Sequence, residues 1–198
     1  MQKILTNKLL KKVVFFVTGN VHKFNEARLT LNEFGFSTAM LNVETIEIQA
    51  DKIEDVAISS AMDAVKKCRL PIIVEDAGLF IKELAGFPGP YSSYVSRTIG
   101  TEGILKLMSN LNKRDAFFES VVAFCSPDWK QPKCFNGKIE GKITRKIRGF
   151  QGFGFDPIFR PVKSENKTLA EMSIVEKNEH SHRANALRKF AGWYVSEL

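Results

Sequence analysis

The apolar residues in the first half of the chain fall into short continuous runs and longer helical patterns. Val13–Val17 is β-branched and aromatic and predicts a buried strand, and similar runs predict strands over 37–43 and 71–74. Between them, residues 22–34 and 53–68 place their apolar side chains at helical spacing. Strand, helix, strand, helix, strand is typical of an α/β sheet whose parallel strands are joined by right-handed crossovers.

The second half has a less regular pattern. Glycine, proline and aromatic residues over 86–95 predict a loop, and residues 101–111 predict a short helix. A long strand is expected over 116–125, followed by a hairpin over 133–147 with glycines at its bends. Ser181 is expected to cap a final amphipathic helix. Strands and helices of both kinds therefore predict a mixed α/β fold.

Length and composition limit the organisation of the chain. Its 198 residues contain no repeat or linker, so we expect a basic extension over 1–12 and one two-lobed domain over 13–198. The first apolar run is too short for a signal peptide or a membrane span. Three cysteines without CxxC spacing indicate a reducing cytoplasm. The net charge of +7 favours anionic partners, either nucleotides or nucleic acid.

The segment from Thr18 to Lys23 joins the first predicted strand to the first predicted helix. This placement directs backbone N–H groups and the positive end of the helix at one point, where an anion can bind. Gly19 allows close approach of the backbone, Asn20 offers an amide, and Lys23 adds a positive charge. Because Thr-Gly-Asn is also a common turn and helix cap, the segment alone leaves both interpretations open.

Carboxylates follow two of the predicted strands. Glu47 comes just after one strand, and the adjacent Glu75 and Asp76 come between the strand over 71–74 and a predicted turn of small residues. Because strand ends face the ligand crevice of an α/β sheet, these acids can meet there. Carboxylates, waters and phosphate oxygens suit Mg²⁺, and a free carboxylate can accept a proton from water. The alternative is a solvated strand end with acids in a turn.

Two later segments are candidates for binding a base. In Gly152–Phe159, two glycines flank Phe153, whose ring could stack on a base or fill the core at a bend. Lys177, His182 and Arg183 precede or open the last helix, and a guanidinium suits a purine carbonyl and a phosphate alike. The histidines lack partners at zinc-ligand spacing.

The stretch over 130–148 is rich in lysine and arginine and is the best candidate for a nucleic-acid surface. Few aromatic residues are interleaved with these charges, and glycines interrupt them. A solvated face of a sheet is the simpler interpretation.

These segments occur together and in one order. TGNVHKFNEA, IEIQ, VEDAGLFIKELAGFPGPYSSYV, GFGFDPIF and AEMSIVEKNEHSHRANAL resemble the Ham1-like inosine triphosphate pyrophosphatase family, archaeal members above all. The resemblance implies an elongated mixed sheet, two lobes flanking a nucleotide cleft, and a homodimer. It also implies Mg²⁺-dependent hydrolysis of ITP, dITP and XTP to the monophosphate and pyrophosphate, in the cytoplasm, with no stable nucleic-acid partner and no membrane.

The resemblance also implies a role for each matching residue. Thr18, Gly19, Asn20, Lys23 and Ala77 would bind the phosphates. Glu47, Asp76 and the adjacent Glu75 would hold Mg²⁺, and Asp76 would be the general base. The residues around the base and sugar would be Phe153, Gly154, Phe155, Asp156, Lys177, His182 and Arg183. This chain departs from the pattern at Ser60, where many members have lysine, and at Ala77, where many have serine or threonine.

Selectivity has a physical explanation in this scheme, because hypoxanthine and xanthine carry a carbonyl at position six where adenine carries an amino group. A donor such as Arg183 pairs with the carbonyl and is left unpaired by the amino group. Two other functions remain open. A binding module would use the positive charge without needing Glu47 or Asp76, and a phosphatase would release orthophosphate instead of pyrophosphate.

Overall fold

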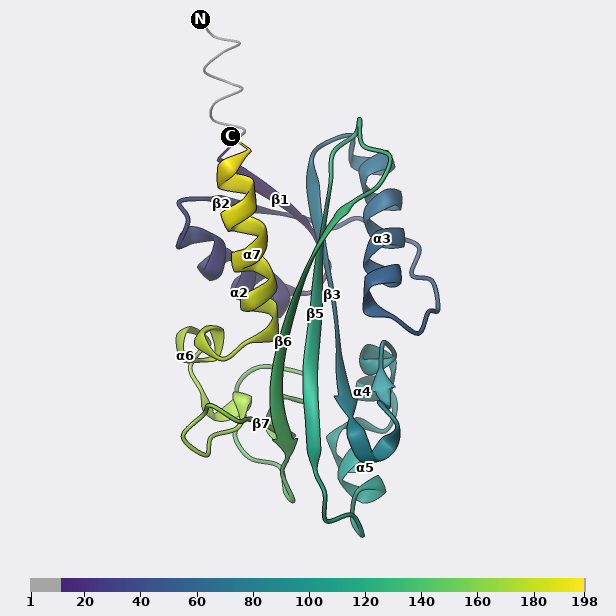
Figure 1. Ribbon diagram of the computed structural model, residues 1–198, viewed down its shortest axis with the longest axis vertical. Coiled ribbons are helices and arrows are strands. Elements are labelled where there is room, and N and C mark those ends of the chain that lie inside the picture. Colours follow the sequence, from purple (N-terminus) through teal and green to yellow (C-terminus); the bar gives the residue numbers. More distant parts are fainter. Residues whose placement is uncertain (1–11, 198) are drawn as a thin grey trace, which may run out of the picture.

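The computed structural model describes residues 12–197, which form a seven-stranded mixed sheet with helices on both faces (Figure 1). The strand order is β2-β1-β3-β5-β6-β7, and β4 pairs with β3 beside this path. The strands β2, β1 and β3 are parallel, whereas every other pairing is antiparallel. The strands are β1 (Val13–Val17), β2 (Ser37–Leu41), β3 (Ile72–Ile81), β4 (Pro88–Gly89), β5 (Asp115–Cys125), β6 (Lys133–Ile143) and β7 (Phe159–Pro161).

Helices cover both faces of the upper part of the sheet, where the parallel strands lie. The helices are α2 (Val21–Asn32), α3 (Ile53–Cys68), α4 (Ser92–Thr98), α5 (Gly100–Leu107), α6 (Ile174–Glu179) and α7 (His182–Ser196). Helices α2 and α7 pack on one face, where Phe16, Ile73 and Phe190 are in the core. Helix α3 packs on the other face, against Ile72 and Val74. The expected crossovers of the α/β region are therefore confirmed.

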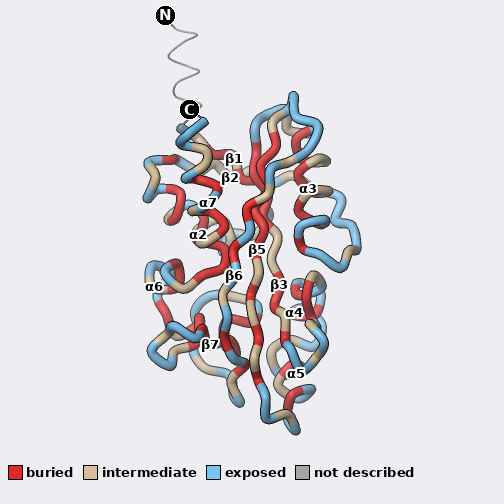
Figure 2. The backbone as a smooth tube through the Cα atoms, viewed as in Figure 1, coloured by how far each residue is buried: buried red, intermediate tan, exposed pale blue. Residues whose placement is uncertain are grey.

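A second lobe surrounds the far halves of the three longest strands, β3, β5 and β6. Its core includes Leu79, Ile81 and Phe118 from the sheet and Ile104 from α5. Buried positions continue along these strands from one lobe into the other (Figure 2). The two-lobed, elongated α/β fold expected from the sequence is confirmed.

The third strand does not end where the sequence predicted. Instead of a turn at Glu75, β3 continues as one strand to Ile81 and pairs along its whole length with β5. Only Ile72 and Ile73 pair with the parallel strand β1, so both acids lie just beyond the parallel part of the sheet. Ion pairs that the sequence does not reveal allow a carboxylate inside a strand.

The prediction of a hairpin over 133–147 was also wrong. Residues Lys133–Ile143 form one strand, β6, between β5 and β7. Gly137 allows close packing instead of a bend, because a Cβ there would lie 2.1 Å from the His182 carbonyl oxygen of α7. The predicted loop over 86–95 likewise contains β4 and the start of α4.

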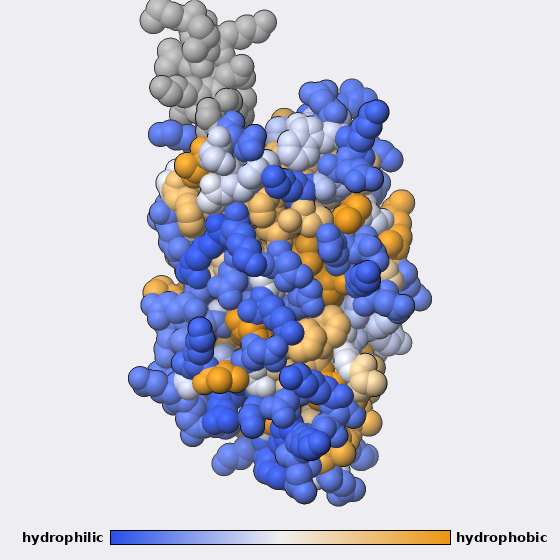
Figure 3. All heavy atoms as spheres, viewed as in Figure 1, coloured by the Kyte–Doolittle hydropathy of each residue, from blue (hydrophilic) through white to orange (hydrophobic). Residues whose placement is uncertain are grey.

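The surface is largely hydrophilic on the face shown in Figure 3, with apolar patches between the hydrophilic residues. The exposed positions of β6 include Lys133, Lys138 and Lys142, so this part of the basic stretch is a solvated strand face. Among the described residues, no helix is long and apolar enough to cross a membrane. The predicted extension over 1–12 lies almost entirely outside the described residues.

Candidate functional site

The loop between β1 and α2 forms the first part of the site. Asn20 caps α2, because its Oδ1 accepts hydrogen bonds from the backbone N–H groups of His22 (2.9 Å) and Lys23 (3.1 Å). Thr18 Oγ1 accepts the Asn20 N–H at 3.1 Å. The N–H groups of Gly19 and Val21 have no acceptor among the described residues. Donors of this kind at the start of a helix are the geometry that an anion site needs, and the expected anion site stays a prediction.

Glu75 and Asp76 are adjacent on β3 but point to opposite faces of the sheet, as neighbouring strand residues do. Glu75 shares its face with Ile73 and is fully buried, with no side-chain exposure. Its Oε1 accepts a hydrogen bond from Ser120 at 2.5 Å. Its Oε2 forms ion pairs with Lys23 and Arg183, at 3.1 Å to each. Both oxygens of Glu75 are therefore engaged by protein groups.

Asp76 is the carboxylate that remains accessible. Its side chain is 30% exposed, Oδ1 accepts the Ala77 N–H at 2.9 Å, and Lys23 Nζ lies 4.0 Å away. Its Oδ2 has no partner among the described residues. Burial raises the pKa of Asp76, and the charges of Glu75 and Glu47 add to this, although Lys23 opposes it. Asp76 therefore has one oxygen without a described partner. Burial and the nearby negative charges favour the binding of a cation or a proton by this carboxylate.

Burial by itself would raise the pKa of Glu75. The charges of Arg183 and Lys23, together with the Ser120 hydroxyl, outweigh that effect and hold the pKa well below its ordinary value. Glu75 is consequently ionised and fixed in position. The same ion pairs hold Lys23, whose Nζ also donates to the Glu75 carbonyl at 3.0 Å.

Glu47 lies in the exposed connection between β2 and α3, close enough to Asp76 for its charge to act there. Within residues 12–197, no group of three or more histidine, cysteine or acidic side chains is arranged to hold a metal ion. Any ion held by Glu47 and Asp76 would need its further ligands from water and substrate. Ser60, a position where the sequence departs from the family pattern, is buried on α3.

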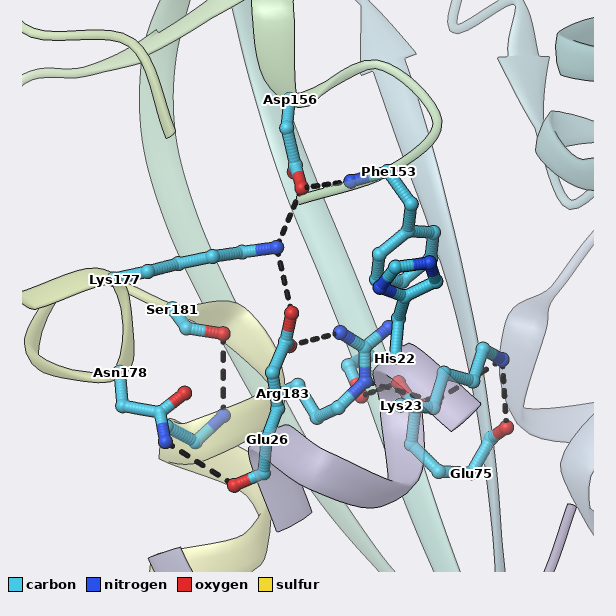
Figure 4. Close-up of polar contacts among 12 residues, drawn as sticks. His22, Lys23, Glu26, Glu75, Phe153, Asp156, Lys177, Asn178, Ser181 and Arg183 are labelled. Carbon is cyan, nitrogen blue, oxygen red and sulfur yellow. Dashed lines mark hydrogen bonds and ion pairs between the residues drawn. The ribbon is translucent and has the colours of Figure 1, made fainter. Parts of the chain in front are cut away.

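A second set of charges lies where α2, α6 and the loop after Phe153 meet (Figure 4). Lys177 Nζ lies 2.7 Å from Glu26 Oε1 and 2.5 Å from Asp156 Oδ2, and all three side chains are buried. Burial raises the pKa of Asp156, although Lys177 opposes this effect. Asp156 Oδ2 also accepts the Phe153 N–H at 2.8 Å, so this ion pair holds the loop in place.

Arg183 connects the two sets of charges. Its Nη1 pairs with Glu26 Oε2, and its Nε pairs with Glu75 Oε2. Burial would lower the pKa of Arg183, but Glu75 and Glu26 outweigh this and raise it. Its Nη2 donates to no described residue. One donor of a buried, rigidly held guanidinium is therefore left for a ligand.

Phe153 covers these cations. Its ring centroid lies 4.9 Å from Lys177 Nζ and 5.4 Å from Arg183 Cζ. The exposed His22 ring stacks on Phe153 with centroids 5.2 Å apart. Beside them is a cavity of about 90 Å³, and His22, Glu26, Gly152 and Lys177 are among its lining residues. An aromatic ring, a cavity and fixed donors are the features expected of a base-binding pocket.

The other predicted base-site residues lie deeper or farther out. Phe155 is 3% exposed in the core of the second lobe, and Gly154 is exposed. His182 is also buried and stacks on Phe118 at 4.6 Å, and its Nδ1 has no hydrogen-bond partner in the described structure. The structure thus brings Phe153, Asp156, Lys177 and Arg183 together directly.

Known proteins are similar to this chain over most of its length. A model of the Ham1 family matches residues 14–193, nearly the whole described chain. The chain belongs to the Ham1 family. A Pyrococcus horikoshii protein named dITP/XTP pyrophosphatase is 49% identical over 185 residues, covering 93% of this chain and 98% of the relative. One of the same name from Methanopyrus kandleri is 46% identical over 185 residues, with 93% and 97% covered.

Solved structures of Ham1 proteins share the fold. The Staphylococcus aureus Ham1 protein matches with a TM-score of 0.80 and 28% identity, covering 94% of this chain and 100% of that one. A HAM1 protein from Coxiella burnetii matches with a TM-score of 0.81 and 29% identity, covering 94% and 99%. The family assignment made from the sequence motifs is therefore confirmed.

Sequence reasoning missed two residues that hold the site together, Glu26 and Ser120. Glu26 is 3% exposed and binds both Lys177 and Arg183. Ser120 is fully buried on β5 beneath Glu75. A clue to Glu26 was present, because it lies next to Ala27 and one turn from Thr30 on the buried face of α2.

Proposed function

We propose that this chain hydrolyses non-standard purine nucleoside triphosphates (ITP, dITP and XTP) to the monophosphate and pyrophosphate, with Mg²⁺. The names of the relatives support the substrate class. The observation that carries the proposal is the link between an accessible carboxylate beside a lysine, Asp76 and Lys23, and an arginine with one free donor, Arg183. We expect one substrate to span both ends of this arrangement.

The phosphates would bind at the loop before α2. The free N–H groups of Gly19 and Val21 and the ammonium of Lys23 supply donors and positive charge. Lys23 is held by Glu75, so its position does not depend on the substrate. A fixed cation of this kind stabilises charge that develops during attack on phosphorus.

Asp76 and Glu47 would hold Mg²⁺. Their carboxylates are the oxygen ligands that this ion prefers, and waters and phosphate oxygens would complete its coordination. When bound, the ion offsets phosphate charge and helps to position a water. Glu75 is excluded from this role in our proposal, because both of its oxygens are engaged by Ser120, Lys23 and Arg183.

Asp76 would also accept the proton of the attacking water through a free carboxylate oxygen. The attack is proposed at the α-phosphate, which gives the monophosphate and pyrophosphate. At the other end, the purine would stack on Phe153 in place of the His22 ring. Arg183 Nη2 would then donate to the six-carbonyl, a contact that adenine cannot make.

Product analysis tests this function. The protein is incubated with Mg²⁺ and dITP, XTP, dATP or dGTP, and pyrophosphate and orthophosphate are assayed separately. Pyrophosphate from dITP and XTP, with little from dATP, is the expected result. Loss of pyrophosphate release in Asp76→Asn would support the catalytic role proposed for Asp76. Orthophosphate as the only product would favour a γ-phosphatase instead, and no turnover would refute the proposal.

Three further expectations stay predictions: the homodimer, the cytoplasmic location and the absence of a stable nucleic-acid partner. The dimer is tested by light scattering during gel filtration, where a mass near twice 22.3 kDa is expected. Binding to single-stranded DNA is expected to be weak and to vanish at moderate salt, as for any basic surface.

A further inference from the structure

Charges of alternating sign form a continuous line through the site, from the Phe153 loop to Asp76, and Figure 4 shows the part from Asp156 to Lys23. The line is buried from Asp156 to Glu75, whereas the side chains of Lys23 and Asp76 are 19% and 30% exposed. In order, the line runs Asp156, Lys177, Glu26, Arg183, Glu75, Lys23 and Asp76. Successive charged atoms are in ion-pair contact, and the last contact, between Lys23 and Asp76, is the longest at 4.0 Å. The line therefore joins the candidate base pocket to the candidate reaction centre without a gap.

Among the described residues, Glu75 is the carboxylate that contacts both Arg183, on the base side of this line, and Lys23, on the phosphate side. A single oxygen, Oε2, lies 3.1 Å from Lys23 Nζ and 3.1 Å from Arg183 Nε. Ser120 holds the other oxygen at 2.5 Å, so the carboxylate has little freedom to rotate. Any movement of Arg183 must change the environment of Lys23 through this shared oxygen.

Stability alone does not account for this arrangement. Taking charges out of water is costly, and buried ion pairs often stabilise a protein no more than apolar side chains of similar volume. Here Lys177, Arg183, Glu26 and Glu75 are all buried. Their placement between the two ends of the proposed substrate indicates a role in transmitting position.

We propose that Glu75 is a positioning residue that couples recognition of the purine to the rate at the phosphate. This inference rests on the proposed function. A purine with a six-carbonyl pairs with Arg183 Nη2 and leaves the guanidinium where Glu75 holds it. A six-amino group repels that donor, displaces Arg183, and through Glu75 moves Lys23 away from the phosphates. Discrimination then affects kcat as well as KM.

The variant Glu75→Gln tests the coupling, because glutamine keeps the size of the side chain and removes the charge shared by Lys23 and Arg183. Steady-state kinetics are measured with dITP and with dATP. We expect kcat for dITP to fall at least about tenfold, with KM changed less, as for loss of a charge-assisted contact. The ratio of kcat/KM for dITP to that for dATP should fall by a similar factor.

A matched control is Glu140→Gln on β6. Glu140 pairs with Lys138 at 2.9 Å on the surface and lies outside the site, so the same chemical change there should leave both kinetic constants and the ratio unchanged. If the wild-type protein does not hydrolyse dITP, the proposed function is refuted before any variant is measured. Failure of the proposed function is therefore distinguishable from failure of the coupling.

If the wild-type protein is active, the ratio of kcat/KM for dITP to that for dATP tests the coupling. A fall in the ratio for Glu75→Gln supports coupling. An equal loss of rate with dITP and dATP, leaving the ratio unchanged, overturns it, because Glu75 would then act only as a structural support. If Glu75→Gln fails to fold, Ser120→Ala replaces it. That variant removes only the hydroxyl that fixes Glu75, and a ratio that does not change would equally overturn the proposal.

Discussion

Replacement of Lys177 by methionine would test the buried ion pairs directly. Methionine keeps much of the aliphatic length but removes the charge that lies 2.7 Å from Glu26 and 2.5 Å from Asp156. Two buried carboxylates then lose a common partner. Breaking a buried pair by removing one partner costs about 3–5 kcal/mol of the free energy of unfolding. For a domain of this size, the melting temperature should fall by roughly 6–20 °C.

The loss of stability caused by Lys177→Met should depend on pH. Burial already raises the pKa of Asp156, and the charge of Lys177 opposes that effect, so removing Lys177 raises the pKa further. A carboxyl group with a raised pKa in the folded state binds a proton there before it does in the unfolded state. Its contribution to stability is therefore present at low pH and lost as the pH rises through the folded pKa. We expect Lys177→Met to lose less stability at pH 5 than at pH 8.

Thermal unfolding of the wild type, Lys177→Met and Lys167→Met at both pH values measures this. Lys167 also forms a 2.8 Å ion pair, with Glu176, but its side chain is 43% exposed, so its loss should matter little. Equal deficits for the two variants would refute the argument that burial sets the cost. A Lys177→Met deficit that does not change with pH would refute the assignment to Asp156.

Three further predictions concern other parts of the molecule. Phe153→Ala should raise KM for dITP roughly 5- to 150-fold, the loss of about 1–3 kcal/mol of stacking, and an unchanged KM would argue against base stacking there. Gly137→Ala should lower the free energy of unfolding in urea by about 3 kcal/mol or more, because the added methyl group would lie 2.5 Å from the Ala186 nitrogen. The methyl group of Gly192→Ala would meet no described atom within 4 Å, so that variant should be neutral or stabilising. Burial holds the pKa of His182 well below its ordinary value, so the unfolded state binds a proton first as the pH falls below about 6.5. Relative to His182→Gln, the wild type should lose up to about 1.4 kcal/mol per pH unit there, and parallel stability profiles would contradict this.

The elements predicted best are those whose apolar pattern is decided locally. Helix α3 begins at Ile53 and ends at Cys68 as its periodicity indicated, and Ser181 caps α7 by accepting the Ala184 N–H. The strands β3 and β6 were misjudged because their extent depends on distant partners. Ten residues of β3 pair with β5, and nothing local in the sequence around Glu75 predicts that.

The residues of the candidate site likewise divide into those that local motifs predicted and those that depend on distant parts of the chain. Lys23, Asp76 and Phe153 were predicted from motifs, because each lies on a segment with recognisable turn or strand chemistry. Glu26 was missed because its function depends on Lys177 and Arg183, which are 151 and 157 residues away in the chain. A carboxylate on a helix is usually solvated, and only the packing of α2 against α6 and α7 buries this one.

The adjacent acids of β3 illustrate how strand geometry separates two functions. Residues of a strand alternate between faces, so Glu75 points toward α2 and α7 while Asp76 points the other way. The first is neutralised by Lys23 and Arg183, and the second keeps an oxygen that no described residue pairs with. A shift of β3 by one residue would exchange the two environments, burying the accessible carboxylate and exposing the fixed one. Ten paired positions between β3 and β5 prevent that shift. The length of this pairing therefore maintains the chemistry of the site as well as the connection between the two lobes.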